Sequence, residues 1–229
     1  MTPVARVALG IVLVAGAGPA GFLLYRVVFG GRLPAQVQPL QPAAQPASPA
    51  APAPRAPVPE RLPTLTMHDA GGTAHTFAEW RGHPLIVNFW ATWCEPCRRE
   101  IPLLKSLRAR AGGVRVVGIA VDFKAAVVRY AADHGIDYPV LVGEDDGLKL
   151  MQAFGMDAVL PFSVFADAEG RIVTVKVGEL HADEADLILG RVADIESGRL
   201  ALPAAQERIA AGMKDLAIEH AKDKAKTPG

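Results

Sequence analysis

Cys94 and Cys97 are the only two cysteines of the 229-residue chain, and two residues separate them. They follow an apolar run over residues 84–90, which has the length and composition of a buried strand, and they open a helical pattern. A cysteine pair at the start of a helix can close a small ring, and its first thiolate faces the positive end of the helix dipole. Because that setting lowers the pKa of a thiol, Cys94 is predicted to be a nucleophile.

Structural roles for the cysteine pair are disfavoured. So small a disulfide ring removes little entropy from the unfolded chain and therefore stabilises the fold only slightly. A structural zinc site needs two further ligands, and the six histidines are scattered without metal-ligand spacing. Redox chemistry is therefore favoured over a two-cysteine metal half-site and over an inert pair, and no metal site is expected.

Charge is divided unevenly along the chain. Of the 24 basic side chains, four precede Glu60 and none of the 24 acidic ones does, so residues 60–229 carry 20 basic against 24 acidic side chains. A slightly acidic domain argues against nucleic acid as a partner. The length and the apolar half of the composition leave room for one domain of ordinary size with extensions.

The N-terminus carries a candidate membrane segment. Residues 7–25 are 19 residues without a charge, bracketed by Arg6 and Arg26. That length can span the hydrocarbon core of a bilayer. The small residues at 15–17 also fit a cleaved signal peptide, but the apolar run continues past them, so an uncleaved anchor over residues 1–33 is favoured. Basic residues on both sides leave its orientation open.

Residues 34–59 form a predicted linker. They contain nine prolines, with alanine and glutamine at most other positions. Such a segment cannot form a helix or a sheet or bury a core, and it adopts semi-extended conformations. Its reach would be up to roughly 80 Å, enough to hold a folded domain clear of a membrane surface.

Residues 60–197 are predicted to form an α/β domain. A hairpin is expected where residues 64–68 and 73–77 flank a turn. Further strands are expected at 85–90, 114–121, 138–142, 161–166 and 171–177, and helices at 98–111, 125–134, 146–154 and 183–196. This order favours a mixed sheet covered by helices on both faces.

Residues 198–229 are predicted to be a helical extension of the domain. A helix is expected from about residue 200 to 225, entered at Pro203, with apolar side chains at helical spacing. We expect a terminal helix, and whether it packs on the domain or on a partner is left open.

Residues 88–100, Asn-Phe-Trp-Ala-Thr-Trp-Cys-Glu-Pro-Cys-Arg-Arg-Glu, resemble the active-site segment of the thioredoxin superfamily, specifically its membrane-anchored thiol-disulfide reductases of the TlpA, ResA and CcmG type. Pro102 falls where the thioredoxin helix kinks. The stretch 124–154 is longer than thioredoxin needs and resembles the extra strand and helix of the TlpA-like group. The resemblance covers roughly residues 60–197 and implies a thioredoxin-like fold with an N-terminal β-hairpin and a central strand-helix insert.

The resemblance also implies roles for individual residues. Cys94 would attack a substrate disulfide, and Cys97 would resolve the mixed disulfide. Glu100, one helical turn beyond Cys97, would assist proton transfer, although a solvated charge or an ion-pair partner remains an alternative. Leu160-Pro161 would form a cis-proline loop that binds polypeptide beside the dithiol. The other residues expected at the substrate surface are Trp93, Glu95 and Pro96.

These features together predict an extracytoplasmic thiol-disulfide reductase. An oxidising compartment would keep the pair as a disulfide, so electrons must arrive from a transmembrane thiol donor. The resemblance and the anchor place the domain on the periplasmic side of a bacterial inner membrane, as a single-pass protein. The resemblance implies clients with a disulfide, such as apocytochrome c or a copper-site assembly protein, and we expect no cofactor beyond the Cys94–Cys97 disulfide.

Two alternatives of other classes stay open. A copper-handling chaperone would bind metal through both cysteines, but the sequence around them has no cluster of Met or His. A thiol peroxidase of the peroxiredoxin type would need a lone peroxidatic cysteine instead of a Trp-Cys-x-x-Cys arrangement.

Overall fold

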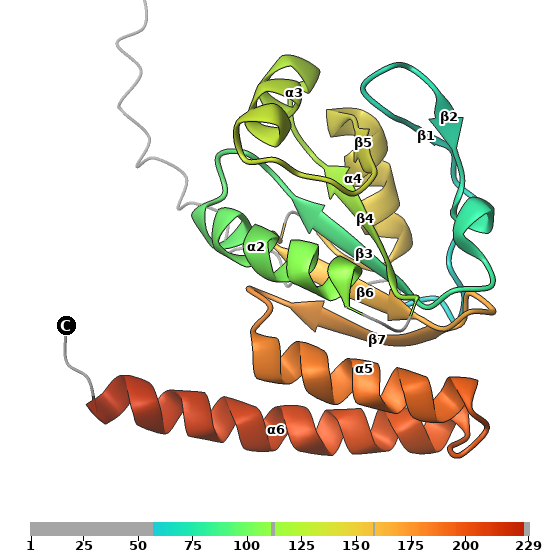
Figure 1. The fold of residues 1–229 in the computed structure, drawn as a ribbon, viewed down its shortest axis with the longest axis vertical. Helices are drawn as coiled ribbons and strands as arrows, with labels where there is room; N and C mark the ends of the chain where they lie inside the picture. The colour runs from blue at the N-terminus through green and yellow to red at the C-terminus, as the bar shows by residue number, and fades with distance from the viewer. Residues whose placement is uncertain (1–56, 111–112, 158, 227–229) are drawn as a thin grey trace, which may run out of the picture. The chain divides into compact units, whose positions relative to one another are not determined.

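The structure, a computed structural model, describes residues 57–110, 113–157 and 159–226 (Figure 1). The predicted anchor over residues 1–33 and almost all of the predicted linker lie outside these residues. Within the described part of the chain, no helix has both the length and the apolar character needed to cross a bilayer. The anchor therefore stays a prediction.

A five-stranded sheet with the order β5-β4-β3-β6-β7 is the centre of the domain (Figure 1). Its strands are β3 (Leu85–Trp90), β4 (Arg115–Ala120), β5 (Val140–Val142), β6 (Phe162–Ala166) and β7 (Ile172–Val177). The strands β3, β4 and β5 run parallel, whereas β6 is antiparallel to β3 and to β7. The sheet is thus mixed, as predicted, and β6 starts at the edge where β3, β4 and β5 end.

Helices cover both faces of the sheet, and this explains why β3 is apolar almost throughout. They are α2 (Glu95–Ala109), α3 (Lys124–Asp133), α4 (Glu144–Ala153), α5 (Ala182–Glu196) and α6 (Leu202–Lys226). Successive side chains of a strand point to opposite faces. Accordingly Ile86 packs in a cluster with residues of α2, α5 and α6, whereas Val87 and Phe89 pack with residues of α4.

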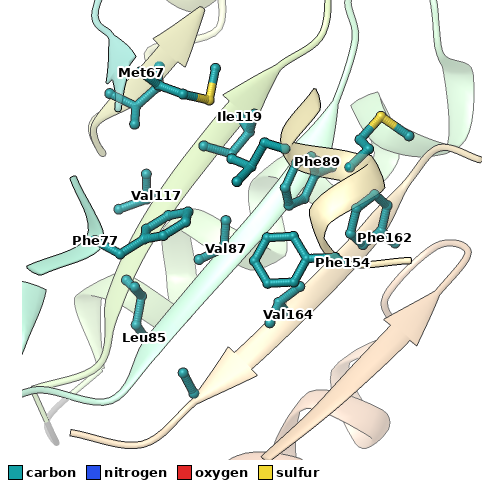
Figure 2. Packing of buried hydrophobic residues seen from close by; sticks show 14 of the residues in the cluster. Met67, Phe77, Leu85, Val87, Phe89, Val117, Ile119, Phe154, Phe162 and Val164 are labelled. Carbon is teal, nitrogen blue, oxygen red and sulfur yellow. The ribbon is translucent and has the colours of Figure 1, made fainter. Parts of the chain in front are cut away.

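An aromatic cluster lies on the α4 face of the sheet (Figure 2). The ring of Phe89 on β3 stacks on that of Phe162 on β6, with 4.2 Å between centroids. Phe154, at the end of α4, meets Phe89 edge-on at 5.6 Å. Aromatic pairs in these geometries stabilise beyond their buried area. They therefore hold the start of β6 beside the end of β3.

The predicted hairpin is present but shorter than expected. It consists of β1 (Met67–His68) and β2 (Ala74–His75), which pair antiparallel. The second strand was predicted to reach residue 77, but residues Phe77–Trp80 form a 3₁₀ helix, η1. The backbone N–H of Thr76 donates to the carboxylate of Glu79 at 2.7 Å, and this capping box starts the 3₁₀ turn and ends the strand.

The helical predictions are confirmed with shifted starts. The helix predicted from residue 98 begins as α2 at Glu95, because Cys94 is its N-cap. The stretch 124–154, in which a strand-helix insert is predicted, forms α3, β5 and α4 between β4 and β6. The predicted terminal helix is α6, which lies along α5 (Figure 1), with Ala205 and Ile209 buried in the same cluster as α5. Packing on the domain, one of the two alternatives, is thus what the structure shows.

Candidate active site

The two cysteines form a disulfide at the start of α2, with 5.3 Å between their Cα atoms. Cys94 is the N-cap residue, and its sulfur accepts a hydrogen bond from the backbone N–H of Cys97 at 3.4 Å. Cys94 is 6% exposed and Cys97 is fully buried. Pro96 lies in the first turn of α2, where a missing N–H costs no helical hydrogen bond. Of the two cysteines, only Cys94 therefore keeps any surface open to solvent.

The loop before β6 packs on the cluster that contains the disulfide. The Leu160–Pro161 peptide bond is cis, as the resemblance implies. Leu160 packs against the cluster that contains both cysteines and Trp90. The carbonyl of Pro161 accepts a hydrogen bond from the N–H of Gly178, just after β7, at 2.9 Å. The loop is thus tied to the end of β7 by a hydrogen bond and packs on the cluster that contains the two cysteines.

Glu100 is buried one helical turn beyond Cys97, on the same side of α2. Its Oε1 accepts a hydrogen bond from the Nδ2 of Asn88 at 2.6 Å, and its Oε2 accepts one from the backbone N–H of Leu180 at 2.7 Å. The alternative of a solvated helix charge is therefore wrong. Glu100 contacts polar donors of β3 and of the segment after β7.

Burial raises the pKa of Glu100 to about 7, although the hydrogen bonds from Leu180 and Asn88 favour the charged form. The negative charge of Glu179 raises this pKa further, and the positive charge of Lys176 lowers it. A carboxyl group with this pKa exchanges a proton near neutral pH, as a general acid or base must.

Asn88 links Glu100 to the strand that follows the cis-proline loop. Its Nδ2 also donates to the Oγ of Ser163 at 3.0 Å, and the two residues are register partners on β3 and β6. Asn88 and Ser163 are both buried. Sequence reasoning did not find Ser163, because its role depends on the register between two strands.

An ion-pair bridge crosses the surface beside the disulfide. The guanidinium of Arg99 contacts the carboxylate of Glu179 three times, at 2.6, 3.0 and 3.1 Å. Its Nη1 also donates to Glu95, between the two cysteines, at 3.1 Å. The predicted surface residue Glu95 is thus exposed and forms an ion pair with Arg99 of the same helix.

A second loop adjoins the cysteine segment at the end of β4. The N–H and the Oγ1 of Thr92 both donate to the Oδ2 of Asp122, at 2.8 and 2.5 Å. The Oδ1 of Asp122 accepts the N–H of Phe123 at 2.7 Å. Because Thr92 precedes Trp93, these bonds bring two large exposed side chains to one edge: Trp93 is 69% and Phe123 is 68% exposed.

Sequence reasoning missed Phe123. A usable signal was present, since the residue lies three positions after the end of a buried parallel strand, β4, and such strand ends gather at one edge of the sheet. Among the described residues, no group of three or more His, Cys, Asp and Glu side chains is placed to hold a metal ion.

The fold and the site define a class of protein. A disulfide at the start of the helix after the central strand, faced by a cis-proline loop, on a five-stranded mixed sheet, belongs to thiol-disulfide oxidoreductases of the thioredoxin-like fold. The family match is equally direct. Residues 57–188 match the family model described as Redoxin, and the chain belongs to that family as a member of the thioredoxin superfamily of the TlpA, ResA and CcmG type.

Comparisons with known proteins agree with this class. The thiol-disulfide oxidoreductase ResA of Bacillus thuringiensis (strain Al Hakam) is 24% identical over 185 residues, which cover 80% of this chain and 93% of that protein. ResA of Bacillus subtilis (strain 168) is 28% identical over 121 residues, 52% of this chain and 66% of that protein. A solved structure of Chlorobium tepidum, described as a thiol:disulfide interchange protein DsbE, has a TM-score of 0.53 at 22% identity over 59% of this chain and 96% of that chain. This structural likeness shows the fold, and the relatives support an oxidoreductase.

Proposed function

We propose that this oxidoreductase reduces disulfides of specific client proteins outside the cytoplasm of a bacterium. The observation that carries the proposal is Glu100, a buried carboxyl group one turn from the buried Cys97, with a pKa of about 7. Such a group can take the proton of a resolving thiol and return it near neutral pH. Cys94, the less buried of the two cysteines, supplies the other half of the reaction.

The first step joins the enzyme to its client. In the reduced enzyme the thiolate of Cys94 attacks one sulfur of the client disulfide, so that the client S–S bond breaks and a mixed disulfide forms. The second client sulfur leaves as a thiolate and takes up a proton. The backbone N–H of Cys97, which donates to the sulfur of Cys94, and the positive end of the α2 dipole stabilise the attacking thiolate.

The second step releases the client. Cys97 gives its proton to Glu100, and the resulting thiolate attacks the sulfur of Cys94. The mixed disulfide breaks, the Cys94–Cys97 disulfide forms, and the departing client thiolate takes up the proton that Glu100 received. The client thus leaves as a dithiol that has gained two electrons and two protons. A thiol donor must then reduce the enzyme disulfide, and a transmembrane thiol protein is the donor we propose. The disulfide needs no further cofactor in this scheme.

The client is proposed to lie across the edge that carries the disulfide. Trp93 and Phe123 flank this edge as exposed apolar side chains, and the Leu160–Pro161 loop borders it. Pro96 and Glu95 lie between the cysteines at the same surface. Apocytochrome c before haem attachment, or a copper-site assembly protein, is the client type we propose from the resemblance.

Location completes the proposal. The uncharged segment over residues 7–25 and the proline-rich segment after it support a single-pass anchor that holds the domain on the periplasmic side of the inner membrane. A dithiol there stays reduced only with a supply of electrons. Protease protection of the full-length chain in sealed spheroplasts tests this placement: degradation from the outside is expected, and protection would contradict it.

Disulfide exchange by the purified full-length chain tests the chemistry. With dithiothreitol as electron source, the chain should accelerate the reduction of insulin, and Cys94→Ser should abolish this activity. Cys97→Ser should instead accumulate a mixed disulfide with its client, which identifies the client when trapped in cells. If Cys94→Ser kept the parental rate of disulfide exchange, the proposed reductase function would be wrong. Stoichiometric copper binding without exchange would favour the chaperone, and peroxide reduction without exchange would favour the peroxidase.

A further inference from the structure

The Leu180 N–H reaches Glu100 from a segment that joins β7 to α5, residues 178–181. Leu180 itself is buried against α5 and the sheet. Of the two hydrogen bonds on the Glu100 carboxylate, one comes from the rigid central strand β3 and the other from this connecting segment. The second bond therefore depends on how the segment is held against α2.

Arg99 contacts this segment from α2. It adjoins Glu100 in the chain but points to the surface, with 52% of its side chain exposed. Three of its hydrogen bonds go to Glu179, the residue before Leu180. A fourth goes to Glu95. A guanidinium that binds a carboxylate through two nitrogens constrains direction as well as distance.

We propose that Arg99 is a positioning residue for Glu100: it holds the 178–181 segment so that Leu180 keeps its hydrogen bond, and it neutralises the carboxylates of Glu179 and Glu95. The importance of this role for catalysis rests on the proposed function, in which Glu100 takes the proton of Cys97. The contacts of Arg99 with Glu179 and Glu95 do not depend on that function.

The charges around Glu100 determine in which direction each substitution should move its pKa. Glu179 disfavours the ionised form of Glu100, and Lys176 of β7 favours it. Lys176 is itself paired with Glu184 of α5 at 2.9 Å. Tyr138, before β5, is a further titratable neighbour, and the charge of Glu100 helps to raise its pKa. Of these neighbours, Glu179 is the one whose charge Arg99 contacts.

Two substitutions then act in opposite directions. Arg99→Gln leaves the carboxylate of Glu179 without the guanidinium and loosens the Leu180 hydrogen bond, and both effects raise the pKa of Glu100. Glu179→Gln removes the negative charge but keeps a carbonyl oxygen that accepts from Arg99, so it lowers the pKa of Glu100. A purely structural role, in which either change only loosens the segment, would move the pKa upward in both variants.

Carbon-13 NMR titration of the Glu100 carboxyl group in the oxidised full-length chain measures this directly. Arg99→Gln should raise the titration midpoint by a few tenths of a pH unit to about one, and Glu179→Gln should lower it by a similar amount. Arg99→Lys keeps the charge and should stay closer to the parent. The matched control is Arg108→Gln. Arg108 lies on the same helix as Arg99 and forms an exposed ion pair with Asp137, with 2.6 Å between the charged atoms, so its loss should leave the midpoint unchanged.

An unchanged midpoint in Arg99→Gln, or shifts of the same sign in Arg99→Gln and Glu179→Gln, would overturn the inference. Far-ultraviolet circular dichroism shows whether each variant folds. If Arg99→Gln does not fold, the midpoints of Arg99→Lys and Glu179→Gln still test the inference. Because the titration uses the oxidised protein and no substrate, failure of the proposed reductase function would appear in the insulin assay and not here.

Discussion

The amide of Asn88 and the carboxylate of Glu100 meet inside the core, with 2.6 Å between Nδ2 and Oε1, although they are twelve positions apart in the chain. This contact joins the central strand to the helix that carries the disulfide. Burial raises the pKa of Glu100 strongly, and the hydrogen bonds from Leu180 and Asn88 limit the rise, so the group titrates at about 7. The balance between these effects makes the site sensitive to pH.

Glu100→Gln should remove a pH dependence of stability. The folded-state pKa of about 7 lies above the ordinary 4.5, so between these values the folded protein holds a proton that the unfolded chain has lost. The unfolding free energy should therefore fall as pH rises from about 4.5 to 7, by at most about 3 kcal/mol. Urea unfolding of oxidised parent and variant at pH 5 and pH 8 measures the difference. An equal pH dependence in both proteins would contradict this.

Asn88→Asp should couple two carboxyl groups in the core. Two adjacent carboxylates cannot both ionise cheaply, so the last proton of the pair should leave at least about one pH unit above the midpoint of the parent. At pH 8 the variant should lose roughly 1–3 kcal/mol of unfolding free energy. Ser163→Ala, which removes the other contact of the same amide without adding charge, is the control and should not move the midpoint. Carbon-13 titration and urea unfolding provide the two readings.

Phe123→Ala should weaken the use of protein clients and spare small disulfides. If Phe123 contacts the client, its loss should raise the KM for insulin about 5-fold, equivalent to about 1 kcal/mol, with kcat little changed. Oxidised glutathione should be reduced at the parental rate. Ile218→Ala is a matched control, because Ile218 of α6 is also an exposed apolar residue, at 54%. Equal effects on both substrates would remove Phe123 from the client surface.

Gly212→Val should destabilise the packing of α6 on α5. A Cβ atom at Gly212 would lie 2.7 Å from a methyl carbon of Leu187, so a branched side chain must displace Leu187 or the helix. Such overpacking costs roughly 1–3 kcal/mol. Gly190→Ala on α5 is the control, since nothing lies within 4 Å of its added Cβ, and it should stabilise by up to about 1 kcal/mol. Thermal unfolding of both variants compares them, and a neutral Gly212→Val would mean that α6 docks loosely.

Much of the fold followed from local pattern. The apolar run of β3 and the helical pattern after the cysteines predicted a buried strand followed by a helix, and both are present. The helix start was placed three residues late, because the capping role of Cys94 cannot be recognised from periodicity. The second hairpin strand was placed too long, because a capping box at Thr76 competes with strand pairing.

The site could be predicted only in part. Cys94 and Cys97 form a compact motif that the sequence shows directly, whereas the Leu160–Pro161 loop was expected only because the family resemblance implies it. Nothing local showed that Glu100 is buried, because a glutamate in a charged helical stretch has the same pattern when it faces solvent. Phe123 was missed for a related reason: its exposure is a property of the assembled edge.

The sequence by itself determined the redox pair, its place before a helix and the order of strands and helices, since these depend on residues within a few positions of one another. The tertiary structure alone decided what surrounds that pair. Glu100 meets Asn88 and Leu180 across 12 and 80 residues, and Thr92 meets Asp122 across 30. Such contacts arise from the order and register of the sheet, which brings distant segments to one edge, and no local periodicity encodes that order.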